Sequence, residues 1–476
     1  MINTESRIGG LGSLLARNAC VRGASPAFCD GRETLSWREA HDVGRSIRSQ
    51  LGDTARGARL ALCGDPGLKT LPMVAALLGA GASVALLDDI ELGRTQLALD
   101  AWAADGWIDV ETSLDPSRIE FEVRALCKQR RPVRAARGAV PSVVFSTSGS
   151  TGCPRLVSLP ENRVLAGSAA IAHALGLFAS DRILSATASN FAYGFNQLIL
   201  GALSGACVVK GGMLDLGYLL RDDQLPVTVL ASGPSQLRTL ATMREAKVRS
   251  EHLRMITSVG SPFPVEVGDH LLDLWPASQI RPMYGMTECM RVSIATHDQF
   301  LSDPTTTGHP LPGVQVAIDS ATNEILVETP YLMDFNSSRS ETGTRVTPID
   351  GRRVLATGDL GRLSEDGQLW VTGRTSQFAK IVDTRVSLAE CEQVANQHPE
   401  VREVAATAGP DQIVLWCEPI GDINRDEVTD QLRRAVVAWH GVLAQADIIV
   451  EFPPRLPRLP NGKIDRPMLK SSSCRY

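Results

Sequence analysis

Short apolar runs alternate with amphipathic stretches between about residues 140 and 290, and this alternation limits the possible folds more than any other feature of the chain. Strands that alternate with helices predict right-handed βαβ units and a largely parallel sheet that is covered on both faces. The first hundred residues repeat the pattern less clearly, with strands expected at 59–63 and 83–87. Further strands are expected at 143–145, 183–184, 207–209, 227–230 and 255–259, and helices at 163–177, 198–203, 236–246 and 265–274.

The pattern changes after about residue 310, where short alternating runs separated by turn residues replace the helices. Strands are expected there at 314–318, 324–327, 353–355 and 368–371. Beyond Arg374 a second unit follows, with helices expected at 388–397 and 426–439 and strands at 401–406, 412–416 and 448–452. We therefore predict an α/β protein with a large N-terminal domain of layered, mostly parallel sheets over 1–373, which includes a β-rich subdomain over about 310–373. A small, mobile α+β domain is predicted over 374–476.

Charge and cysteine usage exclude several classes of protein. The net charge of −5 gives no electrostatic reason to bind nucleic acid or an anionic membrane surface. The 10 cysteines are scattered without metal-ligand spacing, which is typical of buried thiols in a reducing compartment. The most apolar stretch, 73–87, is too short and too rich in glycine to span a bilayer comfortably. We expect a cytoplasmic protein that binds neither nucleic acid nor a membrane.

The segment from Ser146 to Arg155 reads Ser-Thr-Ser-Gly-Ser-Thr-Gly-Cys-Pro-Arg and directly follows a predicted strand. Small residues let the backbone bend so that successive N–H groups point at one anion, and the hydroxyl groups add donors. This is what a nucleoside triphosphate requires, although the segment lacks the Gly-Lys-Ser/Thr ending of a P-loop. The alternative is a flexible linker, which is uncommon between apolar strands of a parallel sheet.

A second segment, Tyr284-Gly-Met-Thr-Glu288, also follows an apolar strand, expected at 280–283. Ligands of open α/β sheets bind beyond the carboxyl ends of the strands, so we expect both segments to face one crevice. Glu288 next to phosphate groups is suited to Mg²⁺, which prefers a carboxylate together with phosphate oxygens and waters. Taken alone, Glu288 also fits a solvated acid in a loop.

Two further segments carry polar groups at turns. Asp359, in Thr357-Gly-Asp-Leu-Gly361, can accept hydrogen bonds from both hydroxyl groups of a ribose, or it can be an ordinary turn aspartate. Asn461-Gly462 is a turn signature that presents Lys463 at a loop tip. A lone lysine at such a tip normally contributes only to solubility.

These four segments, in this order, resemble the adenylate-forming superfamily of acyl-CoA synthetases, adenylation domains of nonribosomal peptide synthesis, and luciferases. The resemblance extends from the Thr-Leu-Ser-Trp-Arg-Glu run at 34–39 to Arg466, and is strongest to stand-alone bacterial acyl-AMP ligases. It implies that ATP is gripped by Thr147, Ser148, Gly149, Ser150, Thr151 and Gly152, with Arg155 in place of the usual lysine, and that Tyr284 also belongs to the nucleotide site.

The resemblance also implies a role for each remaining residue of the catalytic set. Thr287 contacts the α-phosphate, Glu288 holds Mg²⁺, Asp359 and Arg374 bind the ribose, and Lys463 bridges the carboxylate and the α-phosphate. Transfer to a phosphopantetheine thiol then requires rotation of the C-terminal domain about a hinge, which falls on Ser376. Asp383 stands where the family has a glycine beside the pantetheine channel, so the details of thiolation differ here.

The substrate side is less specific. α-Amino-acid-activating domains place an aspartate where this chain has Ala192, and an ammonium buried without a counter-charge is costly, so an ordinary α-amino acid is not expected. Arg291 is expected to form a structural salt bridge, or else to pair with a second polar or acidic group of the substrate. The candidate substrate-binding residues are Ala192, Tyr193, Asn196, Met283 and Arg291.

The predicted function is ATP-dependent activation of a small carboxylic acid as an acyl adenylate, followed by transfer to the phosphopantetheine thiol of a carrier protein or of CoA in a biosynthetic pathway. One alternative is activation of an unusual, non-α amino acid for a nonribosomal peptide carrier protein. The alternative from another class is a catalytically silent binding partner, which would be expected to have lost Glu288, Asp359 or Lys463. The sequence decides neither the acceptor nor the oligomeric state.

Overall fold

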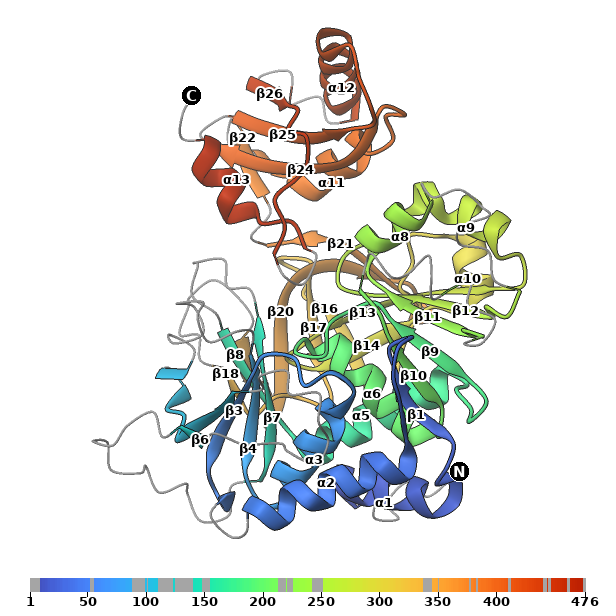
Figure 1. Cartoon of the computed structure of the whole chain (residues 1–476). Coiled ribbons are helices and arrows are strands. Elements are labelled where there is room, and N and C mark those ends of the chain that lie inside the picture. The colour runs from blue at the N-terminus through green and yellow to red at the C-terminus, as the bar shows by residue number, and fades with distance from the viewer. Residues whose placement is uncertain are drawn as a thin grey trace.

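The computed structural model describes residues 9–51, 55–87, 99–100, 102–109, 123–124, 140–147, 155–212, 220, 226–241, 251–336, 345–349, 351–375, 378–381, 384–409, 412–439, 443, 447–459 and 463–473. Two large mixed sheets dominate its N-terminal part (Figure 1). The layered α/β architecture with a small C-terminal domain confirms the predicted fold class.

The first large sheet has nine strands, of which the six from β13 to β1 pair in parallel. The edge strands β2, β14 and β15 pair antiparallel. Across the sheet the order is β15 (His309–Pro310), β14 (Met290–Ile294), β13 (Gln279–Met286), β12 (Met255–Ser258), β11 (Val229–Ser232), β9 (Arg182–Ser185), β10 (Cys207–Lys210), β1 (Pro26–Cys29) and β2 (Thr34–Ser36).

The second large sheet has seven strands, and only β3, β4, β5 and β7 pair in parallel within it. Its order is β18 (Phe335–Asn336), β8 (Arg155–Pro160), β7 (Ser142–Thr147), β4 (Ser83–Leu87), β3 (Arg59–Cys63), β5 (Gly106–Asp109) and β6 (Val123–Arg124). The sequence placed the strand at 143–145 in the same sheet as those at 183–259, and this was wrong, because β7 pairs with β4 and β8.

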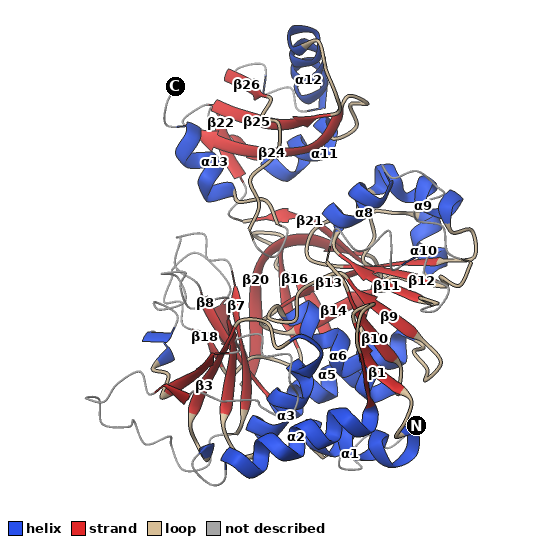
Figure 2. Ribbon diagram, viewed as in Figure 1, coloured by secondary structure: helices blue, strands red, loops and turns tan. Residues whose placement is uncertain are grey.

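Helices pack between and around these sheets, and Figure 2 shows α5 and α6 between them. The helices of the N-terminal part are α1 (Leu11–Arg22), α2 (Trp37–Leu51), α3 (Thr70–Gly79), α5 (Glu161–Leu175), α6 (Ala192–Ser204), α8 (Pro234–Ala241), α9 (Gly268–Leu274) and α10 (His297–Ser302), with 3₁₀ turns η2 (Gly67–Lys69) and η4 (Val265–Val267). Helix α6 begins six residues before the predicted 198, and α5 ends two residues before the predicted 177, because Gly176 is left-handed and caps it. Residues 242–246 of the predicted 236–246 helix lie outside the described residues.

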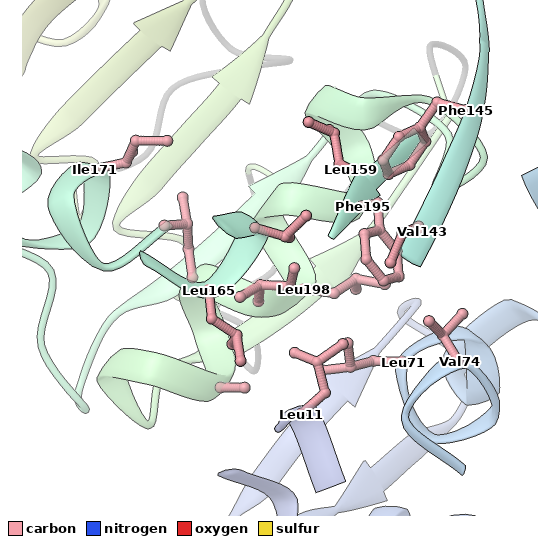
Figure 3. Packing of buried hydrophobic residues seen from close by; sticks show 14 of the residues in the cluster. Leu11, Leu71, Val74, Val143, Phe145, Leu159, Leu165, Ile171, Phe195 and Leu198 are labelled. Atoms are coloured by element: carbon pink, nitrogen blue, oxygen red, sulfur yellow. The ribbon is translucent and has the colours of Figure 1, made fainter. Parts of the chain in front are cut away.

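The core follows from alternation along the strands. Ile183 points into the cluster shared by both sheets and the intervening helices, whereas Leu184 points to the opposite face, against α8 and α9. Between the sheets, the rings of Phe145 from β7 and Phe195 from α6 lie 5.8 Å apart (Figure 3). The two sheets are therefore joined through one apolar core, which fixes the relative positions of their strand ends.

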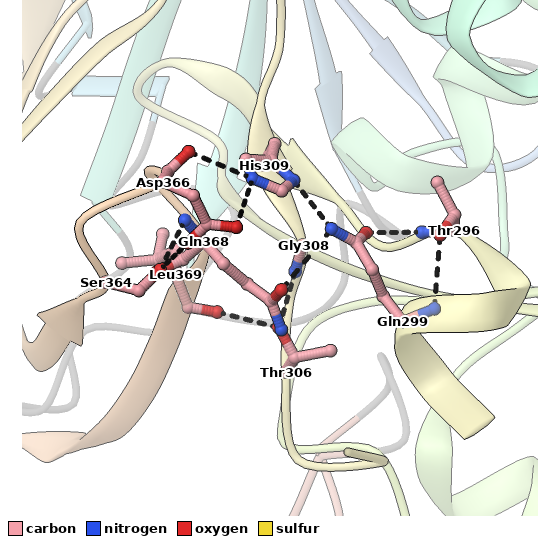
Figure 4. Close-up of polar contacts among 9 residues, drawn as sticks. All are labelled: Thr296, Gln299, Thr306, Gly308, His309, Ser364, Asp366, Gln368 and Leu369. Carbon is pink, nitrogen blue, oxygen red and sulfur yellow. Dashed lines mark hydrogen bonds and ion pairs between the residues drawn. The ribbon is translucent and has the colours of Figure 1, made fainter. Parts of the chain in front are cut away.

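A five-stranded antiparallel sheet follows, with β16 (Gln315–Ile318), β17 (Glu324–Glu328), β20 (Arg352–Leu363), β19 (Arg345–Ile349) and β21 (Leu369–Arg374). The predicted strand at 353–355 is only the start of the 12-residue β20, so Asp359 lies within a strand and not in a turn. Polar contacts tie the β20–β21 turn to β15 and to the loop before it: Gln368 donates to Thr306 at 2.8 Å, and His309 lies 3.2 Å from the Asp366 carbonyl oxygen (Figure 4).

The C-terminal elements stand apart from the large sheets at the top of Figure 1, next to β21. They are β22 (Phe378–Ile381), β23 (Thr384–Ser387), α11 (Leu388–Ala395), β24 (Val401–Gly409), β25 (Gln412–Pro419), α12 (Arg425–Trp439), β26 (Asp447–Glu451) and α13 (Arg466–Ser473). Their main apolar cluster runs from Val386 to Phe452 and contains no residue of the large sheets. Arg238 of α8 crosses to Glu403 of β24, with 3.2 Å between guanidinium and carboxylate.

The cysteines and the helices of the described residues bear on the expectations drawn from composition. No disulfide joins the described cysteines, and all of them except Cys20 are buried. Among the helices that the structure describes, none has both the length and the apolar character needed to cross a bilayer.

Candidate active site

Three segments that are distant in sequence meet around Asp359. The Tyr284 hydroxyl, at the end of β13, donates a hydrogen bond to Asp359 Oδ2 at 2.8 Å. Arg374 Nε lies 3.2 Å from Asp359 Oδ1, because Asp359 and Arg374 are opposite each other in the β20–β21 register. Asp359 is 9% exposed, so its carboxylate is held in a fixed position by a phenol and a guanidinium.

Glu288 lies in the turn between β13 and β14 and is 7% exposed. Burial raises the pKa of its carboxyl group, and Asp359 adds to this effect, whereas Arg374 and Lys463 oppose it. The expectation of a solvated loop acid is therefore wrong. Glu288 is a buried carboxylate that shares its surroundings with two cations and a second carboxylate.

Lys463 comes from the C-terminal part of the chain and reaches the same place. An added Cβ on Gly260 would lie 3.5 Å from Lys463 Cε and 3.9 Å from Nζ, so the end of the lysine lies over the Gly260 backbone. Surrounding protein atoms and Arg374 lower the pKa of the ammonium group, and Asp359 and Glu288 oppose this. Lys463 still keeps surface open to solvent, as a group that must meet a ligand requires. We call Tyr284, Glu288, Asp359, Arg374 and Lys463 the nucleotide-side cluster.

The predicted phosphate loop joins β7 to β8. These strands are antiparallel, and Thr147 pairs with Arg155 at the end of the hairpin. The expectation of a loop between parallel strands was wrong, since the parallel neighbour of β7 is β4. Ser148, Gly149, Ser150, Thr151 and Gly152 lie outside the described residues, as do the predicted hinge Ser376 and the unusual Asp383.

The candidate substrate-binding residues come from α6 and the β13–β14 hairpin. Ala192 and Tyr193 form the first turn of α6, which passes so close to the preceding loop that a Cβ on Gly194 would lie 2.1 Å from Ala188 O. The Tyr193 hydroxyl is 3.0 Å from Thr257 Oγ1, and the Arg291 guanidinium lies 5.1 Å from the Tyr193 ring centroid. We call Ala192, Tyr193, Asn196, Met283 and Arg291 the acid-side cluster.

Thr287 is half-buried in the β13–β14 turn, beside Glu288. Two residues were missed by sequence reasoning, namely Gly260 beneath Lys463 and Thr257 beside Tyr193. A signal for Gly260 existed, because Gly260-Ser261-Pro262 is a turn signature at the carboxyl end of a parallel strand. Nothing in the pattern distinguishes Thr257 from its neighbours in β12.

Comparison with known proteins agrees with this geometry. Residues 15–330 match the family described as AMP-binding enzyme. The chain therefore belongs to the AMP-binding enzyme family.

Two relatives with known roles align along most of the chain. The isonitrile lipopeptide synthase of Streptomyces coeruleorubidus is 26% identical over 95% of this chain, and the novobiocin biosynthesis protein H of Streptomyces niveus is 27% identical over 88% of it. The chain spans 33% of the length of the synthase and 73% of the novobiocin protein. Among solved structures, the anthranilate CoA ligase AuaEII in complex with anthranoyl-AMP has a TM-score of 0.80 at 17% identity, with 99% of each chain covered. This likeness concerns the fold.

Proposed function

We propose that this protein activates a small carboxylic acid with ATP as an acyl adenylate, and then transfers the acyl group to a phosphopantetheine thiol. The observation that carries the proposal is the meeting of Lys463 with Glu288, Asp359 and Arg374, from three distant parts of the chain, in a member of the AMP-binding enzyme family. A silent binding partner would not require a buried carboxylate beside a lysine and an Asp–Arg ion pair.

In the first half-reaction a carboxylate oxygen of the acid attacks the α-phosphorus of ATP, and the bond to pyrophosphate breaks. Negative charge grows on the phosphate oxygens, so fixed cations and N–H donors lower the barrier. Lys463 is assigned to the α-phosphate and the reacting carboxylate, and Thr287 to the α-phosphate. Asp359, held by Tyr284 and Arg374, is assigned to the ribose hydroxyl groups.

Glu288 fits a magnesium site. The described residues contain no group of three or more His, Cys, Asp or Glu side chains that would form a cage for a metal. Mg²⁺ does not require such a cage, because it usually takes one or two carboxylates together with phosphate oxygens and water. Glu288 is the buried carboxylate beside the assigned nucleotide position, and the bound ion would neutralise phosphate charge there.

The phosphate loop from Thr147 to Gly152, with Arg155 at its end, is assigned to the β- and γ-phosphates. In the second half-reaction the thiolate sulfur attacks the acyl carbon and AMP leaves. We place the domain boundary at 373–374 and the hinge at Ser376, so that rotation of the C-terminal domain withdraws Lys463 before the thiol enters. The Arg238–Glu403 ion pair would then hold the orientation that serves adenylation.

The acceptor is a carrier protein or CoA, and the pathway is biosynthetic, in keeping with the names of the two bacterial relatives. Among the described residues, the acid-side cluster supplies no carboxylate for an α-ammonium group, which supports an acid without an α-amine. Activation of an unusual amino acid remains the second candidate. A cytoplasmic location accords with the use of ATP and with the buried cysteine side chains in the described part of the chain.

The test is acid-dependent exchange of pyrophosphate into ATP, measured over a panel of fatty, aryl, hydroxy and amino acids. Exchange with at least one acid, reduced by Lys463→Ala, is the expected result. Tight ATP binding without exchange for any acid would favour the silent binding partner.

A further inference from the structure

Arg291 is a buried cation with no anionic partner among the residues that the structure describes. It is 7% exposed, and its Nε is buried without a hydrogen-bond partner. None of the described carboxylates lies within ion-pair distance, although ion pairs are numerous elsewhere in the described residues. The alternative that Arg291 forms a structural salt bridge is therefore wrong for the described part of the chain.

The neighbours of Arg291 do not replace a counter-ion. Its guanidinium lies over the Tyr193 ring, and a cation–π contact recovers less than the burial of a charge costs. Burial raises the pKa of the Tyr193 phenol, so the ring beneath the guanidinium is neutral and supplies no counter-charge. Within the described part of the chain, the charge of Arg291 is left unbalanced.

Arg291 also lies outside the nucleotide-side cluster. Asp359 contacts Tyr284 and Arg374, whereas the Arg291 guanidinium lies over the Tyr193 ring of α6. Arg291 follows the turn and faces Gly285 across the β13–β14 hairpin, with its side chain toward α6. Its position suits a substrate group remote from the reacting carboxylate better than it suits a phosphate.

Hydrogen bonds to the protein hold the side chains around Arg291 in position. Tyr193 is fixed through its hydroxyl to Thr257 Oγ1 at 3.0 Å. Asn196, one turn further along α6, donates from Nδ2 to Ser168 Oγ at 2.7 Å, and its buried Oδ1 has no partner. The acid-side cluster therefore contains a donor without a partner, Arg291 Nε, and an acceptor without a partner, Asn196 Oδ1.

We propose that the acid activated by this enzyme carries a second carboxylate, which Arg291 receives at the end of the substrate remote from the adenylate. The proposal rests on the proposed function and specifies its substrate class as dicarboxylic acids. The planar guanidinium matches a carboxylate with two parallel hydrogen bonds, and a carboxylate balances the buried charge. A hydroxyl group would leave the charge unbalanced, and an amine would be repelled.

The test compares pyrophosphate exchange for matched pairs of acids, in which an aliphatic or aryl monocarboxylic acid is paired with the dicarboxylic acid of the same carbon skeleton. The wild-type protein is expected to favour the dicarboxylic member of a pair by about 10- to 100-fold in kcat/KM, as a hydrogen bond to a charged group provides. Arg291→Gln should abolish this ratio, and Arg291→Lys should retain part of it. The matched control is Arg345→Gln, an exposed arginine in β19, which should leave the ratio unchanged.

The outcomes separate the two proposals. Equal or better exchange with the monocarboxylic acids, unchanged in Arg291→Gln, would overturn the second-carboxylate proposal while adenylation stands. No exchange with any acid would overturn the proposed function. If Arg291→Gln does not fold, the wild-type ratio and the Arg291→Lys variant still decide, because a structural arginine has no reason to distinguish one carboxylate from two.

Discussion

The nucleotide-side and acid-side clusters both bury charge, but they balance it differently. Asp359 is matched within the protein by Tyr284 and Arg374, whereas Arg291 faces an aromatic ring and a neutral thiol. Because Asp359 is balanced by its own neighbours, it is held in position before the ligand arrives, which suits a ligand that is the same in every turnover. A cluster with unbalanced charge depends on its ligand, and so it selects among acids.

The largest effect is expected from Lys463→Ala, which removes the cation that the C-terminal part contributes to the nucleotide-side cluster. Acid-dependent exchange should fall by about 100- to 1000-fold, as for loss of one transition-state donor. Thioester formation from a supplied acyl adenylate should fall far less, because the proposed rotation of the C-terminal domain withdraws Lys463 in that step. Exchange assays and single-turnover thiolation measure the two effects.

The control for Lys463 is Lys470→Ala, an exposed lysine of α13, which should leave both steps unchanged. Equal losses in the two half-reactions would contradict the assignment of Lys463 to adenylation, since Lys463 would then stabilise the fold or act in both steps.

Asp359→Asn is expected to have the next largest effect, because it removes the charge that Arg374 pairs with and that Tyr284 donates to. Hydrogen bonds to charged groups are worth about 1.5–3 kcal/mol, so the KM for ATP should rise about 10- to 100-fold. The preference between dicarboxylic and monocarboxylic acids should not change. Asp298→Asn, at an exposed position in α10, provides the control. A change in acid preference would show that the two clusters are coupled.

The third largest effect is expected from Gly260→Ala, which changes the backbone that lies beneath Lys463. Gly260 has φ +106°, and a Cβ there would lie 3.5 Å from Lys463 Cε. Backbone strain of about 1–3 kcal/mol should lower stability, and displacement of the lysine should lower exchange by roughly tenfold. Gly421→Ala is the matched control, since Gly421 has φ +74° with nothing within 4 Å. Similar loss of exchange in both variants would assign the effect to folding alone.

Much of this fold could be predicted because alternation along the chain reports burial directly. The strands expected at 59–63 and 83–87 agree with β3 and β4 residue for residue. The pattern did not separate the two large sheets, since pairing of β7 with β8 depends on which edges meet in space and not on local periodicity. It also ended β20 too early, because the polar stretch around Asp359 hides a continuous strand.

In the site, too, the local pattern could be predicted and the packing of distant segments could not. The resemblance carried by the four segments indicated Glu288, Asp359 and Lys463, but their proximity depends on the packing of three separate segments. That no described carboxylate pairs with Arg291 could not be predicted, because it depends on every segment that packs around the side chain. Gly260 has a turn signature in the sequence, but its place in the site depends on Lys463, which lies over its backbone.

The smallest effect, on stability, is expected from Glu288→Gln and depends on pH. Burial raises the pKa of Glu288 above its ordinary value, so the folded protein binds this proton more tightly than the unfolded chain. The contribution of Glu288 to stability is therefore fully present below the ordinary glutamate pKa of about 4.3, and is lost as pH rises through the raised folded value. Glutamine does not titrate, so Glu288→Gln should gain in Tm relative to the wild type as pH increases across this window.

Thermal melting of both proteins without nucleotide, from pH 4.5 to pH 8, measures this difference, and Glu33→Gln at an exposed position should show none. Exchange activity of Glu288→Gln should nevertheless be lost, because the carboxylate assigned to Mg²⁺ is gone. A gain in stability together with a loss of activity would show that the charge of Glu288 is balanced only when its ligand is bound, as we infer for Arg291. A Tm difference that stays constant with pH would instead mean that Arg374 and Lys463 already balance this carboxylate, and would place Glu288 with Asp359 among the internally matched groups.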